Sequence, residues 1–232
     1  GSRKVPGLKF DVNELDDGIE MKMIVKAGTV IKNPIHLCFG MIPEDGVQRI
    51  VMDVDIEEDT QTAIYAHCTF PNAVDIEHIM DAKINIGPNA RYSYHERHIH
   101  GGHGGIKVVP KTSVELQERA RFKTLFELLR GYVGKIDIDY EVTCHAYSVM
   151  ELDARINGKG KDDIRINETG HLVGEGARGF LNSRIAVRDD AQAEVYNKLT
   201  ASAPYARGHV DCKEIVQDNG RAAAIPVVDV KH

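Results

Sequence analysis

The side chains best suited to chemistry are a few cysteines and histidines that lie far apart along the chain. Cys212 lies in a strand-like run, GHVDCKEIV, which the turn signature Asp218-Asn219-Gly220 separates from a second run, AAAIPVVDV. A thiolate is a good ligand for iron or zinc, but most free cysteines are small buried hydrophobes, and residue type alone favours that interpretation for Cys212. His209, in the same run, and His232, at the end of the chain, are further candidate metal ligands. One thiol near the end predicts a site that needs a partner to complete it.

The other three cysteines lie at positions 38, 68 and 144, and no CxxC pair occurs. Cys144 is the second candidate for chemistry, although it shares its strand phase with Val142 and Tyr140, which favours a core thiol. We interpret Cys38 and Cys68 as structural. Since an iron–sulfur cluster normally takes four ligands, we do not expect a closed cluster site within one chain.

Four histidines follow one another at positions 95, 98, 100 and 103, and the last of them lies within a Gly-rich segment, GGHGG. His98 and His100, with Glu96 nearby, resemble part of a cupin ligand set, and imidazole suits iron, zinc, copper or nickel. The segment that follows offers no further glutamate. We therefore expect a solvated loop here, with an adventitious or a functional metal site as the alternatives.

Other catalytic signals are missing from the sequence. No Ser-His-Asp set or pair of carboxylates stands out, and the Gly-rich segments GHLVGEGARG and NGKGKDD do not have the spacing of a P-loop. We expect a protein that is not an enzyme, and any ATP hydrolysis would have to come from a partner.

Charge and composition limit the partners. The net charge is −6 and the pI about 6.0, which argues against nucleic acid. No run of 18 apolar residues and no apolar stretch near the N-terminus occurs, so we expect no membrane span and no signal peptide. Widely spaced cysteines in a chain of 232 residues are typical of reduced thiols, and we predict a cytoplasmic protein.

Short runs of alternating apolar and polar residues fill most of the chain, as in Val51 to Ile56. Residues 74 to 82 allow one helical turn. A polar or Gly turn followed by alternation recurs in steps of 30, 28 and 29 residues from Ala90, and a second series is offset from the first by 14 residues. Such a period is typical of stacked rungs. The pattern leaves a β-solenoid, a β-sandwich and a jelly roll open.

Four segments resemble the core domain of the SufB/SufD family of iron–sulfur cluster assembly scaffolds, and most closely its archaeal SufB-like form, also called SmsB. They are YHERHIHGGHGGIKVVPK, FELLRGYVGKIDIDYEV, NETGHLVGEGARGFLNSRIAV and PYARGHVDCKEIVQDNGRAAAIPVVDV. The resemblance implies one all-β domain over residues 1–232, a right-handed parallel β-helix. Residues 81–232 match clearly and residues 1–80 more loosely.

The resemblance also implies a function. It predicts a cytoplasmic scaffold that holds an iron–sulfur cluster transiently, works as a homodimer through its C-terminal strands, and acts with a SufC-like ABC ATPase. Cys212 falls on the position of a cysteine that accepts sulfur and ligates the nascent cluster. The family's His-Glu ligand pair and its ATPase-docking helices would follow residue 232, so we expect this chain to lack them. The alternatives are a cupin-like metal-binding enzyme that uses His98 and His100, and a purely structural β-solenoid.

Overall fold

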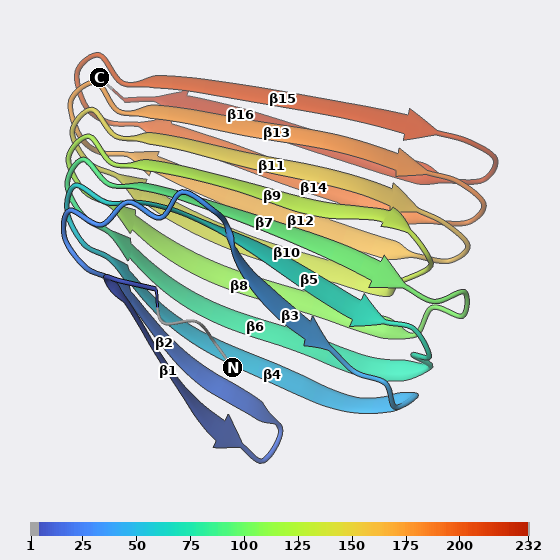
Figure 1. The fold of residues 1–232 in the computed structure, drawn as a ribbon. Coiled ribbons are helices and arrows are strands. Elements are labelled where there is room, and N and C mark those ends of the chain that lie inside the picture. The colour runs from blue at the N-terminus through green and yellow to red at the C-terminus, as the bar shows by residue number, and fades with distance from the viewer. Residues whose placement is uncertain (1–4, 232) are drawn as a thin grey trace.

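The computed structural model describes residues 5–231, and this part of the chain is built from β-strands alone (Figure 1). Every strand between residues 5 and 231 belongs to one of two sheets. This part of the chain contains no helix that is long and apolar enough to cross a membrane. The two sheets lie face to face, and the chain alternates between them. Consecutive strands are thus the two sides of one rung, as in a solenoid.

The larger sheet has the order β1 (Leu8–Leu15), β2 (Gly18–Val25), β4 (Asp45–Ile56), β6 (Asp75–Ile86), β8 (Ile106–Leu116), β10 (Gly134–Cys144), β12 (Asp163–Leu172), β14 (Gln192–Ala201) and β16 (Arg221–Val230). The smaller sheet has the order β15 (Arg207–Val216), β13 (Arg178–Val187), β11 (Val149–Gly158), β9 (Arg121–Arg130), β7 (Arg91–His100), β5 (Gln61–Phe70) and β3 (Ile35–Gly40). Neighbouring strands pair in parallel throughout, except that β1 pairs antiparallel with β2.

The parallel register confirms the predicted repeat. Arg91 pairs with Arg121, Arg121 with Val149, and Val149 with Arg178, which are steps of 30, 28 and 29 residues. Residues with positive φ recur at the same corner of successive rungs: Asp59, Asn89, Arg119, Tyr147, Gly176 and Tyr205. At this corner each rung's backbone N–H donates to a carbonyl of the next rung, as from Asp59 to Pro88 and from Asn89 to Glu118. These hydrogen bonds align the corners of successive rungs. Together with the parallel pairing of the strands, they identify the fold as a parallel β-helix and not a sandwich or a jelly roll.

Two local predictions need comment. The helical turn expected at residues 74–82 is wrong, because this segment lies in β6, where Ile76, His78 and Met80 point inward. The predicted turn at Asp218-Asn219-Gly220 is confirmed, and Asp218 has a φ of 55°. It joins β15 and β16, which belong to different sheets, so it is a corner of the solenoid and not a hairpin turn.

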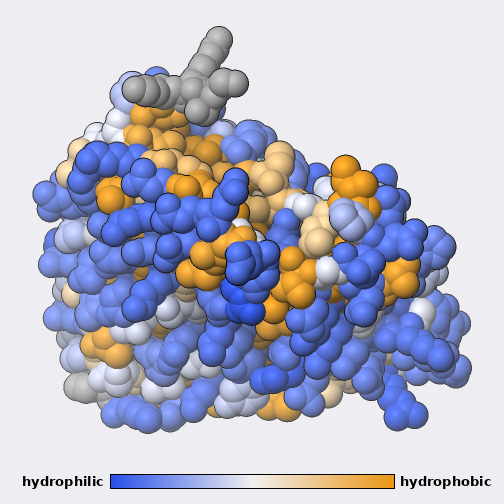
Figure 2. Space-filling model, turned by 90° about the horizontal axis from the view of Figure 1, so that it is seen from below, coloured by the Kyte–Doolittle hydropathy of each residue, from blue (hydrophilic) through white to orange (hydrophobic). Residues whose placement is uncertain are grey.

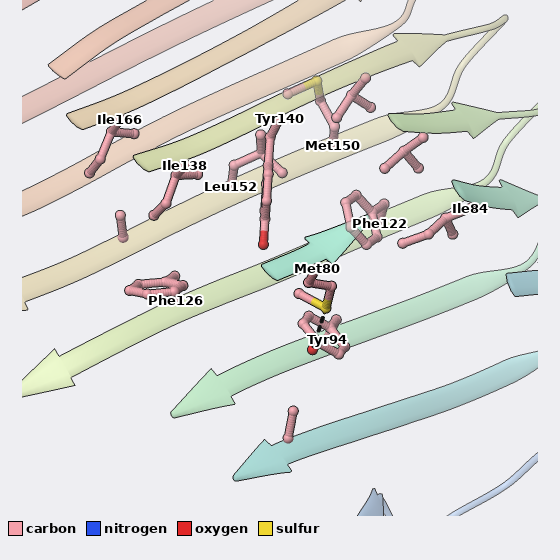
Figure 3. Packing of buried hydrophobic residues seen from close by; sticks show 14 of the residues in the cluster. Met80, Ile84, Tyr94, Phe122, Phe126, Ile138, Tyr140, Met150, Leu152 and Ile166 are labelled. Carbon is pink, nitrogen blue, oxygen red and sulfur yellow. Dashed lines mark hydrogen bonds between the residues drawn. The ribbon is translucent and has the colours of Figure 1, made fainter. Parts of the chain in front are cut away.

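The core fills the space between the sheets. Alternate residues of each strand are buried, and Figure 3 shows side chains from both sheets, such as Phe126, Tyr140 and Leu152, packed in the interior. The Tyr94 hydroxyl lies 3.8 Å from the sulfur of Met80 across this core. Burial of each large apolar side chain stabilises the fold by roughly 1.5–3 kcal/mol, so the stacked rungs support one another.

The last rungs at both ends of the solenoid leave apolar side chains exposed. At the end that carries β1 to β4, hydrophobic groups form a band between polar ones (Figure 2), and Phe10, Val12 and Ile42 are exposed there. At the other end β15 and β16 are the outermost strands of their sheets, and Val228 and Val230 are 48% and 67% exposed. The segment AAAIPVVDV lies in β16, an edge strand of the larger sheet, and an edge strand tolerates Pro226, which has no N–H to donate to a neighbouring strand.

Candidate functional site

Cys212 lies in the middle of β15, at the open C-terminal end of the solenoid. It pairs in register with Ser183 of β13, whose side chain is fully buried, so the thiol belongs to the inward-facing column of that sheet. No described strand stacks beyond β15 in this sheet, which leaves the thiol only half-buried. Cys212 is therefore part of the interior and also reachable from the open end.

Polar groups surround Cys212 in these last rungs. The Asn197 side-chain amide lies 3.8 Å from Cys212 Sγ and, on its other side, 3.2 Å from Glu168 Oε2. Burial raises the pKa of the Cys212 thiol, with smaller contributions from the carboxyl groups of Glu214 and Glu168. Burial, with a smaller repulsion from Asp153, also raises the pKa of Glu168 to about 8. The resting thiol is thus protonated at neutral pH and must lose its proton to ligate a metal.

The two other predicted ligands near the C-terminus are not brought to this thiol within the described residues. His209 is exposed on the outer face of β15, with its ring 6.3 Å from that of Phe180. Since successive side chains of a strand alternate between its faces, His209 and Cys212 point to opposite sides of the sheet. His232 lies outside the described residues.

Cys144 is a core thiol, as its strand phase predicted. It ends β10, is fully buried with Val142 and Tyr140, and has its pKa raised to about 12 by that burial. In the sheet register it aligns with Leu172, Ala201 and Val230, so it lies three strands away from the open end, about 14 Å at the usual strand spacing. The structure does not bring Cys144 and Cys212 together.

The histidine run is not the solvated loop that we expected. His98 and His100 lie in β7 and point into the interior together with Glu96, while only His103 lies in the Gly-rich loop. Both faces of β7 carry polar side chains, so hydropathy alternation gave no sign of its buried face. His98 Nδ1 lies 3.1 Å from His100 Nε2, and His98 Nε2 lies 2.6 Å from Glu96 Oε1.

Two residues that the sequence did not mark as metal ligands complete this buried group. Cys68 of β5 and His78 of β6 join Glu96 and His98, and one potential ligand atom from each residue lies within 4.8 Å of all the others. We call these four residues the interior cluster. The structural interpretation of Cys68 agrees with its burial, but Cys38 is exposed on β3 and is not a core thiol. The 30-residue repeat contained a signal for Cys68, since it pairs in register with His98.

Burial disfavours the charged form of every member of the interior cluster. It lowers the pKa of His78 to about 4 and that of His98 to about 3. It raises the pKa of the Glu96 carboxyl, and burial together with Glu96 raises the pKa of the Cys68 thiol well above its ordinary value. Desolvation is the largest cause in each case, because a charged form in the apolar interior loses its hydration.

Comparisons with known proteins find similar chains in archaea. It is 37% identical over 97% of its length, and over 71% of the relative's length, to an "Iron-sulfur cluster assembly SufBD family protein" of Methanocaldococcus jannaschii. It is 30% identical over its whole length, and over 71% of the relative, to a protein of the same name from Pyrococcus horikoshii. A second protein of that name from P. horikoshii is 23% identical, with 46% of its length covered. No protein-family model matches the chain.

Proposed function

Since this chain belongs to the SufBD family of iron–sulfur cluster assembly proteins, we propose that it acts as a scaffold on which a cluster is built and then released, and not as an enzyme. The cluster is its cargo. A scaffold needs ligands that hold iron but do not enclose it, because the cluster must leave again. An incomplete ligand set at a surface suits that task better than a closed site of four thiolates.

The observation that carries this proposal is the position of Cys212. It is half-buried in the inward column of the last rung, where a thiolate can bind iron and still be reached from outside. Within residues 5–231, Cys68 and Cys144 are fully buried, and Cys38 is exposed on β3, far from the C-terminal strands. Cys212 is therefore the thiol that we assign to sulfur acceptance and cluster binding.

One chain offers one thiol at this end, so the rest of the ligands must come from elsewhere. We propose that two copies meet through the outer edges of β15 and β16 about a two-fold axis. Strand edges carry unpaired backbone groups that can hydrogen-bond to a second chain, and exposed Val228 and Val230 would be buried there. Such a dimer would bring two copies of Cys212 to one interface.

A separate partner would supply ATP hydrolysis. The sequence contains no P-loop, and we propose a SufC-like ABC ATPase in this role, as the family resemblance implies. The described residues contain no helix, so docking would use the outer face of the strands or a part of the protein outside them.

Anaerobic reconstitution with ferrous iron and sulfide tests the scaffold. Cys212→Ser removes the soft ligand and keeps nearly the same volume, so we expect the variant to fold and to retain no cluster, measured by visible absorption and by iron and sulfide content. Cys144→Ser is the matched control and should retain as much cluster as the parent. A Cys212 variant that holds as much cluster as the parent would show that this assignment is wrong.

The two alternatives make different predictions. A cupin is an antiparallel barrel, so the parallel pairing of β5, β7 and β9 rules out that fold for His98 and His100. A purely structural solenoid would bind no cluster and would associate end to end into filaments, which electron microscopy of the purified chain would reveal.

A further inference from the structure

We infer that the interior cluster of Cys68, His78, Glu96 and His98 is a binding site for one Zn²⁺ ion, separate from the cluster site at Cys212. The four side chains come from three strands, β5, β6 and β7, and from both sheets. Each is at most 2% exposed, and their potential ligand atoms lie within 4.8 Å of one another. A metal ion held there would link the two sheets across the solenoid.

The donor set matches zinc chemistry. One sulfur, two imidazole nitrogens and one carboxylate oxygen are the atoms that tetrahedral Zn²⁺ takes, at about 2.0–2.3 Å. Those bond lengths correspond to about 3.3–3.7 Å between neighbouring ligand atoms. Cys68 Sγ and Glu96 Oε1 are 4.0 Å apart, close to that spacing, while the 2.6 Å contact between Glu96 and His98 would open as the ion enters.

Groups around the cluster orient the two imidazoles. Gln48 donates from Nε2 to the Gly40 carbonyl, and its Oε1 lies 2.9 Å from His78 Nδ1. The amide oxygen can only accept, so Nδ1 of His78 carries the proton and Nε2 keeps its lone pair for a metal. His98 in turn has Nδ1 occupied by His100 and Nε2 directed at Glu96. Outer contacts of this kind are typical of metal-binding histidines.

Charge and hydrogen bonding also favour an ion. Among the described residues, Glu96 Oε2 is buried and has no hydrogen-bond partner, which is costly for a carboxyl group. Zn²⁺ with one thiolate and one carboxylate has no net charge, so the site can lie in an apolar interior. The rings of Phe70, 5.1 Å from His78, and Phe126, 4.8 Å from His98, surround it.

The smaller sheet is irregular next to the interior cluster. The pairing of β7 with β9 shifts between His98 and Ile99. A surface hollow lies over this irregularity, lined by Arg97, His98, Ile99, Glu127, Leu129 and Arg130. The ion would enter through a local opening of this bulge or during folding.

The test is metal retention by the purified chain. Protein refolded with ZnCl₂ and passed through a chelating column should keep one Zn²⁺ per chain. Refolding with Co²⁺ should give the visible bands of a tetrahedral ion and a thiolate-to-cobalt charge-transfer band in the near ultraviolet. Cys68→Ser should lose that band, whereas Cys144→Ser and Cys212→Ser should keep it.

Further variants separate this site from its surroundings. Gln48→Ala should weaken Zn²⁺ affinity about 10–100-fold while leaving the four ligands in place. If the Cys68 variant does not fold, the parent still decides, because a parent that retains no Zn²⁺ and shows no cobalt spectrum overturns the proposal. A charge-transfer band that survives in Cys68→Ser also overturns it. Neither result bears on cluster retention at Cys212, which is measured separately.

Discussion

Replacing Glu168 by glutamine is expected to stabilise the protein strongly at pH 8 and only slightly at pH 5. Glu168 is 2% exposed and lies beneath the open end of the solenoid, beside Asn197. Its pKa is raised to about 8 from an ordinary value of 4.5, chiefly by burial. Glutamine has the same shape as the protonated acid and does not ionise.

The size of the effect follows from proton linkage. Between pH 4.5 and pH 8 the unfolded chain has released the Glu168 proton while the folded chain still holds it, so the parent loses about 1.4 kcal/mol of stability per pH unit. The stability tied to the protonated acid is complete below pH 4.5 and lost as pH rises through 8. The advantage of Glu168→Gln should grow from about 1 kcal/mol at pH 5 to about 4 kcal/mol at pH 8.

Unfolding in guanidinium chloride, followed by circular dichroism at pH 5, 6, 7 and 8, measures this difference. Glu194→Gln is the matched control, because Glu194 is exposed on the outer face of β14, and its effect should stay within about 0.5 kcal/mol at every pH. An advantage of Glu168→Gln that is equal at pH 5 and pH 8 would refute the reasoning, and so would one that shrinks as pH rises.

Two further predictions concern the dimer and the corners of the solenoid. Light scattering should give about twice the chain mass of 25.7 kDa. Val228→Asp should shift the protein towards monomer. A parent protein that is monomeric at micromolar concentration would contradict the dimer. Gly105→Ala should cost more than about 3 kcal/mol, because φ is +78° and a Cβ would lie 1.8 Å from the Val74 carbonyl oxygen. Gly28 has a φ of +71° and open space around an added Cβ, so Gly28→Ala should lower the free energy of unfolding by only about 1–2 kcal/mol. Equal shifts of the unfolding midpoint in guanidinium chloride for the Gly105 and Gly28 variants would contradict this prediction.

The strands and their stacking period could be predicted from the sequence because a solenoid repeats its local pattern, whereas the choice of a parallel β-helix over a sandwich or a jelly roll rested on the family resemblance. Each strand buries every second side chain against the rungs above and below, and each corner needs a turn, so alternation and turns recur every 28–30 residues. The same alternation places Cys212 on one face of β15 with Val210 and Val216, and His209 on the opposite face. The helical turn at residues 74–82 was wrong because His78 on the inner face and Ile79 on the outer face interrupt the apolar alternation of β6.

What alternation cannot tell is which inward side chains meet. His98 and Cys68 are neighbours because β5 and β7 pair in register, and His78 joins them from the opposite sheet because of the length of the turn between β5 and β6. Likewise, the half-burial of Cys212 depends on β15 being the outermost strand of its sheet. The sequence by itself determined most of the strands, their faces and the stacking period, since these depend on local chemistry; it did not determine the buried face of β7, because both faces of that strand are polar. Only the tertiary structure decided the interior cluster and the accessible thiol, because both depend on register and stacking order between segments far apart in the chain.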